Sequence, residues 1–454
     1  MNINMVNPQP TISAYVRNYV CMRVVLLLIS LFGALLVNAQ NEELLVKLKK
    51  GIEAIRLYQL ENANKYFDEV YTHKNELNAE QLGEFLYYYS RAKYQLFIEM
   101  GNANKQQFAS LDLQQKAYSA YNILLELNRV ENKRWQSKAE TQMRAMTEGL
   151  FEASLITLDY YFNSTENNPK KWLYRSSATG YISLAQTIDP TSYVSHELNG
   201  QLFFFEKDSA SAAYHLDRCI ELYSTMRKNV KENVRIADVA NKRARMLFNS
   251  GLYDTASSLV DFGIYITEFE MKAIEAGKGT QYNNQEVNFS AQLATEIRKE
   301  LNLLKLEIAA NNKEKDFQEA IGLFMDLEDD LATESRYFLF RGQLVEDAKP
   351  FEALKHYAKA VELDDSLFDA CYYAGALYFA LADEYRQAAQ KDEKNSADYI
   401  KNSFSLFNAG YPIMQQAHYL EPTNRYVLTS LYHVAKMLNK ADDAAQYAEL
   451  LTNK

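Results

Sequence analysis

The sequence predicts an all-helical chain built from stacked pairs of antiparallel helices. Apolar residues recur three or four positions apart over long stretches, as at Leu44, Leu48, Ile52 and Ile55, which places them on one face of a helix. The alternation of apolar and polar residues that marks a half-buried strand is nowhere sustained. The chain of 454 residues is too long for one compact core, and its 15 glycines and 7 prolines are few enough for long helices joined by short turns.

Residues 1–39 are predicted to be a secretory signal peptide. The almost unbroken apolar run Val24–Val37 is followed by the small residue Ala39, after which the sequence turns polar at once. This run is too short to cross a bilayer comfortably, so we expect cleavage after Ala39 and no integral membrane span in the mature chain; an uncleaved anchor is the alternative. Met22 is an alternative start, because residues 1–21 show no periodic pattern.

Residues 40–178 are expected to form helix hairpins whose repeat pattern is degenerate. One pair is expected between Leu44 and Leu77, where Gly51, Ala63 and Phe67 alternate small and large side chains at helical spacing. Two further pairs are expected by their apolar spacing: Phe85–Met100 with Leu111–Leu127, and Thr141–Phe162 with Lys170–Ile188.

Residues 179–454 carry a clearer repeat with a period near 34 residues. Small and large residues recur in a fixed order, in the blocks containing Ala212 and Leu216, Ala244 and Ala256, Ala320 and Phe324, Gly342 and Tyr357, and Gly375 and Tyr378. Insertions are predicted near 227–236, 271–300 and 383–403, and the segment 277–280 within the second is predicted to be a flexible connection between Phe269 and Ala291. Prolines are predicted to mark helix ends: Pro169, Pro190, Pro350, Pro412 and Pro422.

These blocks resemble the tetratricopeptide repeat family. Small residues at the crossing of two helices let the backbones approach, and a large residue one turn later fills the adjacent space. The endings Ile188-Asp189-Pro190 and Leu420-Glu421-Pro422 are similar to the closing turn of that repeat. The resemblance implies a right-handed α-solenoid superhelix, and together with the Asn38-Ala39-Gln40 junction the chain looks like an exported Bacteroidota protein.

Charge and cysteine content exclude several classes of function. The formal net charge is −10, and removal of the signal segment, which holds Arg17 and Arg23 but no acid, makes it more negative. An acidic surface argues against nucleic acid and against anionic membrane surfaces as partners. Cys219 and Cys371 are predicted to be buried free thiols, because two distant cysteines make no disulfide framework.

No constellation of catalytic, cofactor-binding or metal-binding residues is recognisable. The six histidines are scattered without the spacing of metal ligands, and His196 is interpreted as a packing residue. The acidic pairs Asp329-Asp330 and Asp442-Asp443 fall where helices are expected to begin, so they are interpreted as caps of free backbone amides. We therefore expect a protein that is not an enzyme and has no cofactor.

The resemblance places a partner in the concave groove lined by the first helices of successive hairpins. Candidate residues occupy the second, fifth, ninth and twelfth positions of the repeat: Glu197, Gln201, Phe204, Asn241, Arg245, Phe248, Lys305, Arg336, Gln343 and Tyr372. Asn241 and Arg245 are similar in placement to residues with which family members clamp a C-terminal carboxylate. Mixed aromatic and polar side chains suit recognition of a peptide segment.

The predicted function is a non-catalytic interaction scaffold of the periplasm or cell envelope, associated with a protein or peptide partner. The alternative is a ligand-binding component of a glycan uptake system, because the helical receptors of such systems also contain tetratricopeptide units. The sequence predicts neither the partner's identity nor the oligomeric state.

Overall fold

The computed structural model describes residues 42–226, 234–275, 284–312 and 317–452, and within these ranges the secondary structure is helical, without a strand. The predicted all-α architecture of stacked helix hairpins similar to tetratricopeptide repeats is confirmed. The segment 1–41, with its predicted signal peptide, lies outside the described residues, as does most of the predicted insertion 227–236. No helix in the described ranges combines the length and apolar character needed to cross a membrane.

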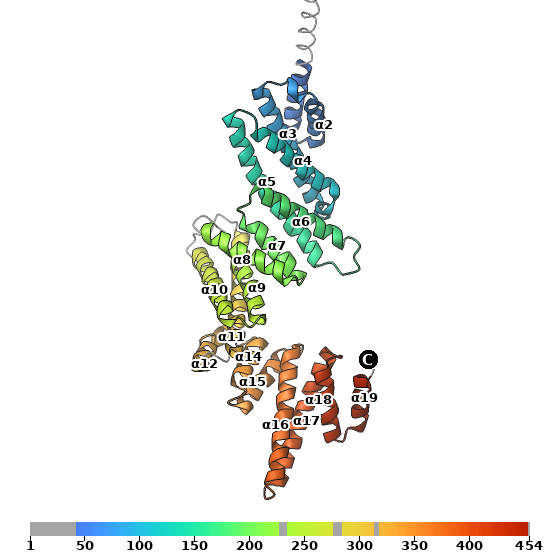
Figure 1. Cartoon of the computed structure of the whole chain (residues 1–454), viewed down its shortest axis with the longest axis vertical. Helices are drawn as coiled ribbons and strands as arrows, with labels where there is room; N and C mark the ends of the chain where they lie inside the picture. The colour runs from blue at the N-terminus through green and yellow to red at the C-terminus, as the bar shows by residue number, and fades with distance from the viewer. Residues whose placement is uncertain (1–41, 227–233, 276–283, 313–316, 453–454) are drawn as a thin grey trace, which may run out of the picture. The chain divides into compact units, whose positions relative to one another are not determined.

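The chain divides into two compact units, Met1–Glu206 and Lys207–Lys454. Residue 178, after which the repeat type is predicted to change, lies inside α6 (Lys171–Ile188). In unit 1 a helix over residues 42–56 precedes α2 (Leu60–Tyr71), α3 (Ala79–Ala103), α4 (Leu111–Asn128), α5 (Lys133–Phe162), α6 and α7 (Tyr193–Phe205) (Figure 1).

Unit 2 contains the remaining helices. They are α8 (Ser209–Met226), α9 (Val234–Asn249), α10 (Tyr253–Glu275), α11 (Asn284–Asn311), α12 (Phe317–Asp326), α13 (Glu328–Leu331), α14 (Ser335–Val345), α15 (Pro350–Leu363), α16 (Phe368–Lys391), α17 (Ser396–Leu420), α18 (Arg425–Met437) and α19 (Ala441–Thr452). Sequential helices pair, and the first helices of successive hairpins also touch one another: α3, α5 and α7 in unit 1, and α9, α11, α14, α16 and α18 in unit 2. We call each series the first-helix row of its unit.

Glycines mark the crossings of the hairpins, as the sequence predicts. A Cβ added at Gly51 would lie 2.5 Å from Cε1 of Phe67, and one at Gly342 would lie 2.4 Å from Cε1 of Tyr357. Both aromatic rings are fully buried. The aromatic ring of one helix therefore rests on the bare backbone of the other, which confirms the packing expected from the small and large positions.

One expectation about helix ends is wrong. Pro412 lies inside α17, where Tyr411 and Met414 on either side of it are buried in the core shared with α16. Burial of these side chains keeps the helix continuous across a residue that cannot donate a backbone hydrogen bond. The segment 277–280, predicted to be a flexible connection, lies outside the described residues; α10 runs to Glu275 before it and α11 begins at Asn284 after it.

The insertion predicted near 383–403 lengthens both members of a hairpin. Helix α16 has 24 residues and α17 has 25, and the short turn between them lies within the predicted range. His196 is buried, and its Nε2 lies 3.4 Å from Nε2 of Gln186, which confirms a packing role. Both Cys219 and Cys371 are buried cysteines that form no disulfide, also as predicted.

Candidate functional site

The predicted groove residues belong to the first-helix rows, but to two different units. Glu197, Gln201 and Phe204 lie on α7 of unit 1, and the other seven lie in unit 2 on α9, α11, α14 and α16. Glu197 is only 1% exposed, and its Oε1 accepts a hydrogen bond of 3.0 Å from Nε2 of Gln201. On α7, the acidic candidate is therefore a buried residue of the hairpin interior.

The two predicted arginines of unit 2 bridge neighbouring helices of the first-helix row. Nη1 of Arg245 on α9 lies 2.9 Å from Oε2 of Glu307 on α11. Arg336 on α14 holds Glu300 of α11 with two bonds, of 3.0 and 2.5 Å. Because each guanidinium already has a carboxylate partner, a ligand carboxylate at Arg245 would have to share the guanidinium with Glu307. These arginines act first as ties between repeats.

The remaining predicted residues of unit 2 have mixed surroundings. Lys305 is paired with Asp261 of α10 at 2.8 Å, so its charge is directed to a second helix. Phe248 packs against Tyr253, with ring centroids 5.7 Å apart, and Tyr372 stacks on Phe368 at 5.8 Å. Among the described residues, the buried side-chain oxygens of Asn241 and Gln343 have no hydrogen-bond partner. The structure thus leaves two amide oxygens of the predicted set without a hydrogen bond.

Replacing Arg336 by alanine is expected to lower the free energy of unfolding by about 1 kcal/mol at neutral pH, because the half-buried Glu300 loses its bidentate partner. Burial alone would raise the pKa of Glu300, but hydrogen bonding and charge from Arg336, with Arg245 and Lys299, lower it. A carboxyl with a lowered pKa stabilises the fold above its ordinary value of 4.5, and this contribution is lost as the pH falls.

The difference between the wild type and Arg336→Ala should therefore shrink in urea titrations below about pH 4.5. The matched control is Lys359→Ala, which removes an exposed pair with Glu362 on one helix and should cost at most a few tenths of a kcal/mol. If the difference in unfolding free energy between the wild type and Arg336→Ala stayed constant down to pH 3, the pair of Arg336 and Glu300 would not tie α11 to α14.

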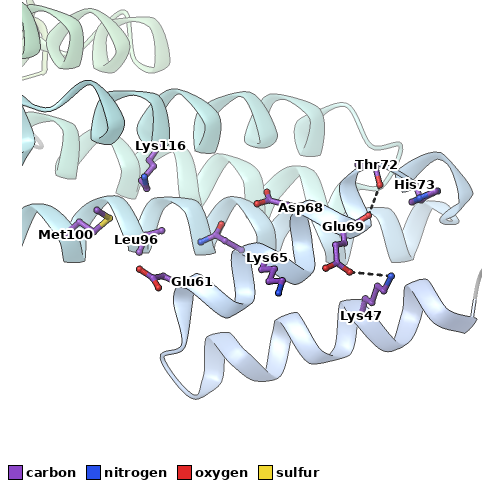
Figure 2. Close-up of a pocket in the computed structure, with 11 residues that line it drawn as sticks. Lys47, Glu61, Lys65, Asp68, Glu69, Thr72, His73, Leu96, Met100 and Lys116 are labelled. Atoms are coloured by element: carbon purple, nitrogen blue, oxygen red, sulfur yellow. Dashed lines mark hydrogen bonds and ion pairs between the residues drawn. The ribbon is translucent and has the colours of Figure 1, made fainter.

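A surface pocket of about 730 Å³ lies over α2 and the neighbouring helices of unit 1 (Figure 2). Most of its charged groups are neutralised within the protein. Lys47 contacts Glu69 at 3.3 Å, Lys116 contacts Asp112 at 2.5 Å, and Asp68 accepts hydrogen bonds from Tyr89 and Lys93. A pocket in which most charges are satisfied internally has little to offer a charged ligand.

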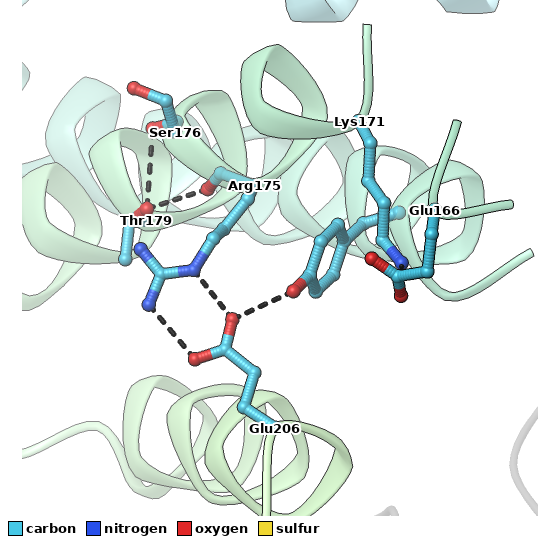
Figure 3. A network of polar contacts seen from close by, with 7 residues as sticks. Glu166, Lys171, Arg175, Ser176, Thr179 and Glu206 are labelled. Carbon is cyan, nitrogen blue, oxygen red and sulfur yellow. Dashed lines mark hydrogen bonds and ion pairs between the residues drawn. The ribbon is translucent and has the colours of Figure 1, made fainter. Parts of the chain in front are cut away.

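A polar network joins α5, α6 and the end of α7 (Figure 3). Arg175 binds both carboxylate oxygens of Glu206, at 2.5 and 2.9 Å, and the Tyr161 hydroxyl donates to the same carboxylate at 2.9 Å. Beside it, Lys171 pairs with Glu166 at 2.5 Å. All four charges are partnered, so the network stabilises the end of unit 1 and is no binding site.

A different situation is found between α3 and α5, which are neighbours in the first-helix row of unit 1. Two adjoining pockets of about 360 and 420 Å³ share Tyr94, Gln95 and Ala145. We call them together the α3–α5 groove. Its lining residues are Tyr87, Arg91, Tyr94, Gln95, Ile98 and Glu99 of α3, and Ser137, Lys138, Thr141, Gln142, Ala145, Glu148, Gly149 and Glu152 of α5.

Two glutamines in the middle of the α3–α5 groove have open hydrogen-bonding capacity. In the described part of the chain, Oε1 of Gln95 and Nε2 of Gln142 are buried without a hydrogen-bond partner. The other end of Gln142 accepts from the hydroxyl of Ser90 at 3.3 Å. A buried polar atom left unpaired costs about 1–3 kcal/mol, so such a pair marks a place where a ligand would supply the missing bonds.

Charged residues of the α3–α5 groove are separated by sign. Arg91 and Lys138 lie at one end, and Glu99, Glu148 and Glu152 lie at the other. Within the described ranges, none of these five residues has an ion-pair partner; Lys138 rests 4.6 Å from the ring centre of Tyr87. In contrast to Arg245 and Arg336, their charges remain available to another molecule.

Tyr94 forms the bridge across the α3–α5 groove. Its hydroxyl donates to the carbonyl of Ala145 at 2.9 Å, and a Cβ added at Gly149 would lie 2.1 Å from the same hydroxyl oxygen. Burial, with the negative charges of Glu148 and Glu152, raises the pKa of Tyr94 to about 12. The glycine therefore makes room for a neutral tyrosine between the two helices.

Sequence reasoning missed the α3–α5 groove because 40–178 departs from the full repeat pattern. A signal was present: Arg91, Gln95 and Glu99 are spaced by four and share one helix face, as do Lys138, Thr141, Ala145 and Glu152. Among the described residues, no group of three or more histidine, cysteine or acidic side chains could hold a metal ion.

The fold and the first-helix rows define a helix-hairpin repeat protein. No model of a known protein family matches the chain, and no curated protein matches it. Among solved structures it is similar to yeast Tom70, with 14% identity over 90% of this chain and 91% of Tom70 and a TM-score of 0.30.

Two further similar structures are the human IFIT1 dimer with PPP-AAAA and a Rap protein complexed with competence and sporulation factor. Identity to IFIT1 is 13% over 88% of each chain, with a TM-score of 0.29. Identity to the Rap protein is 14% over 91% of this chain and 97% of that one, with a TM-score of 0.26. Because these TM-scores are low, the assignment of the fold rests on the helix packing within the chain.

Proposed function

We propose that the protein is a non-catalytic interaction scaffold that holds a polypeptide segment of a partner in the α3–α5 groove. One observation carries this proposal: two buried glutamine ends in the groove lack hydrogen-bond partners within the described residues. A peptide group carries one donor and one acceptor, so a single bound segment supplies both missing bonds. The acidic net charge of −10 supports a protein partner over nucleic acid.

We further propose that the scaffold is exported and works in the periplasm or at the outer membrane of a Bacteroidota-like cell. The apolar run Val24–Val37 and the small residue Ala39 support export. A solenoid of helix hairpins suits an envelope assembly, because each repeat adds surface along which a partner can lie. The glycan-uptake alternative stays a prediction.

The test places a photo-crosslinking amino acid at Ala145, an exposed residue that lines both pockets of the groove, in the full-length protein expressed in its own cells. The matched control is Ser183, which is exposed on α6 of the same unit. We expect a discrete protein adduct from position 145 and none from 183, with the purified chain beginning at Gln40. Equal adducts at both positions, or retained glycan without protein, would contradict the proposal.

Replacing Gln95 by methionine is expected to separate stability from binding. Methionine keeps the size of the side chain and removes the unpartnered oxygen, so the melting temperature of the free protein should stay equal or rise. The adduct formed from position 145 should fall at the same time, because the partner loses a hydrogen bond. A variant that crosslinks as well as the wild type would show that Gln95 does not contact the partner.

A further inference from the structure

The α3–α5 groove has a direction, and this direction restricts what it can bind. Along α3, Arg91 and Glu99 are eight residues apart, which corresponds to about 12 Å at the rise of an α-helix. On α5, Lys138 precedes Glu148 and Glu152 by ten and fourteen residues, about 15 to 21 Å. Both walls therefore run from positive to negative in the same order.

The middle of the groove favours an extended segment over a helical one. The free polar atoms of Gln95 and Gln142 require a donor and an acceptor. Backbone groups of a helix are engaged within the helix, whereas an extended backbone presents its N–H and C=O groups to the side. Either carboxamide can turn over and exchange its oxygen and nitrogen, and a peptide group meets both arrangements.

We propose that the α3–α5 groove binds an extended peptide segment with an acidic side chain against Arg91 and Lys138 and a basic side chain against Glu99, Glu148 and Glu152. At about 3.3 Å per residue in an extended chain, the two side chains are about four to six residues apart. Even spacing places both side chains on the same face of the segment. The inference rests on the proposed scaffold function and names the chemistry of its partner.

Partly buried tyrosines and apolar atoms also line the groove and add to its specificity. Tyr87 lies at the basic end, and Tyr94 and Ile98 line the centre and the acidic end. Opposite charges at the two ends reject segments that carry a single sign, because one end of such a segment would face a like charge. The order of the two charges also fixes the direction in which the segment lies.

The test uses a phage-displayed library of random dodecapeptides, selected on the full-length mature protein. Peptides recovered on the wild type should carry an acidic and a basic residue four to six positions apart, in one fixed order. The variant Glu148→Lys with Glu152→Lys should instead recover peptides with two acidic residues, and its affinity for the wild-type peptides should fall at least tenfold. Glu140→Lys, an exposed change on α5 outside the groove, should leave the selection unchanged.

A synthetic copy of the best peptide, methylated on the central backbone nitrogens, should bind at least tenfold more weakly than the unmethylated peptide. If the affinity did not change, the glutamines would contact a side chain of the peptide and not its backbone. The proposal that the peptide binds through an extended backbone would then be wrong. Three results would overturn the proposed charge polarity. They are recovery of peptides without the charge pair, the same peptides on the wild type and on Glu148→Lys with Glu152→Lys, and no enrichment of any peptide. The scaffold function would survive these results if position 145 still crosslinks to a partner, and it would fail if that adduct is absent.

Discussion

Trp135→Ala is expected to lower the free energy of unfolding of unit 1 by about 3–5 kcal/mol, the largest effect of any substitution considered for this chain. Trp135 is 2% exposed, and its ring lies on Gly83, where a Cβ would come within 2.3 Å of the indole Cδ1. The indole Nε1 donates to Oε2 of Glu80 at 3.0 Å. Removing the ring leaves a cavity between α3 and α5 and takes away one of the donors to the Glu80 carboxylate, which keeps its bonds from Asn132 and Arg134.

The chain supplies its own control, because it has only one other tryptophan. Trp172 is 66% exposed, so Trp172→Ala should change stability by at most about 0.5 kcal/mol. Urea unfolding followed by circular dichroism measures both variants, and hydrogen exchange assigns the loss to unit 1. If Trp135→Ala cost less than about 1 kcal/mol, α3 and α5 would not pack as described, and the groove between them would be in doubt.

The hairpin architecture was predictable from sequence because its determinants are close together in the chain. Gly51 and Phe67 are sixteen residues apart and Gly342 and Tyr357 fifteen, and in both pairs the ring lies on the glycine backbone. Helical spacing within each member and a short turn between them suffice to bring such residues together. Handedness of the superhelix is a property of many repeats, and it stays a prediction.

The roles of charged residues could not be predicted in the same way, because they depend on partners far away in sequence. Arg245 finds Glu307 at a separation of 62 residues, and Arg336 finds Glu300 at a separation of 36. The position of each arginine within the repeat correctly predicted that both lie on first helices. It could not predict that both carboxylate partners lie on α11. The same holds for Gln95, because its side-chain oxygen lacks a hydrogen bond only if α5, distant in sequence, places no donor beside it.

Pro412 shows a third kind of difference between sequence and structure. Proline lowers the stability of a helix interior by about 3 kcal/mol, which supports the expectation of a helix end. In α17 the neighbouring Tyr411 and Met414 are almost completely buried against α16 and α18. Burial of two such large side chains contributes about 1.5–3 kcal/mol each, enough to outweigh the lost backbone bond. A local preference is thus overruled by packing that no short window of sequence contains.

Gly342→Ala is expected to destabilise unit 2, whereas Gly322→Ala is expected to stabilise it. Alanine at either position gains up to about 1 kcal/mol of helix propensity. At Gly342 the added methyl group would lie 2.4 Å from Cε1 of the fully buried Tyr357, and such overpacking costs about 1–3 kcal/mol. At Gly322 on α12, no atom lies within 4 Å of the added methyl group, so only the gain remains.

Thermal and urea unfolding of the two variants should therefore shift in opposite directions. A second substitution, Tyr357→Leu, removes the ring atoms that meet the methyl group but also the hydroxyl that donates to Glu346 at 2.5 Å. A double-mutant cycle therefore measures the effect of Gly342→Ala in two backgrounds, the wild type and Tyr357→Leu. Both proteins of the Tyr357→Leu background lack the hydroxyl, so its loss cancels from the comparison. We expect Gly342→Ala to become neutral or stabilising when Leu replaces Tyr357. An equal cost in both backgrounds would place the strain elsewhere and refute the crossing of α14 and α15 at this glycine.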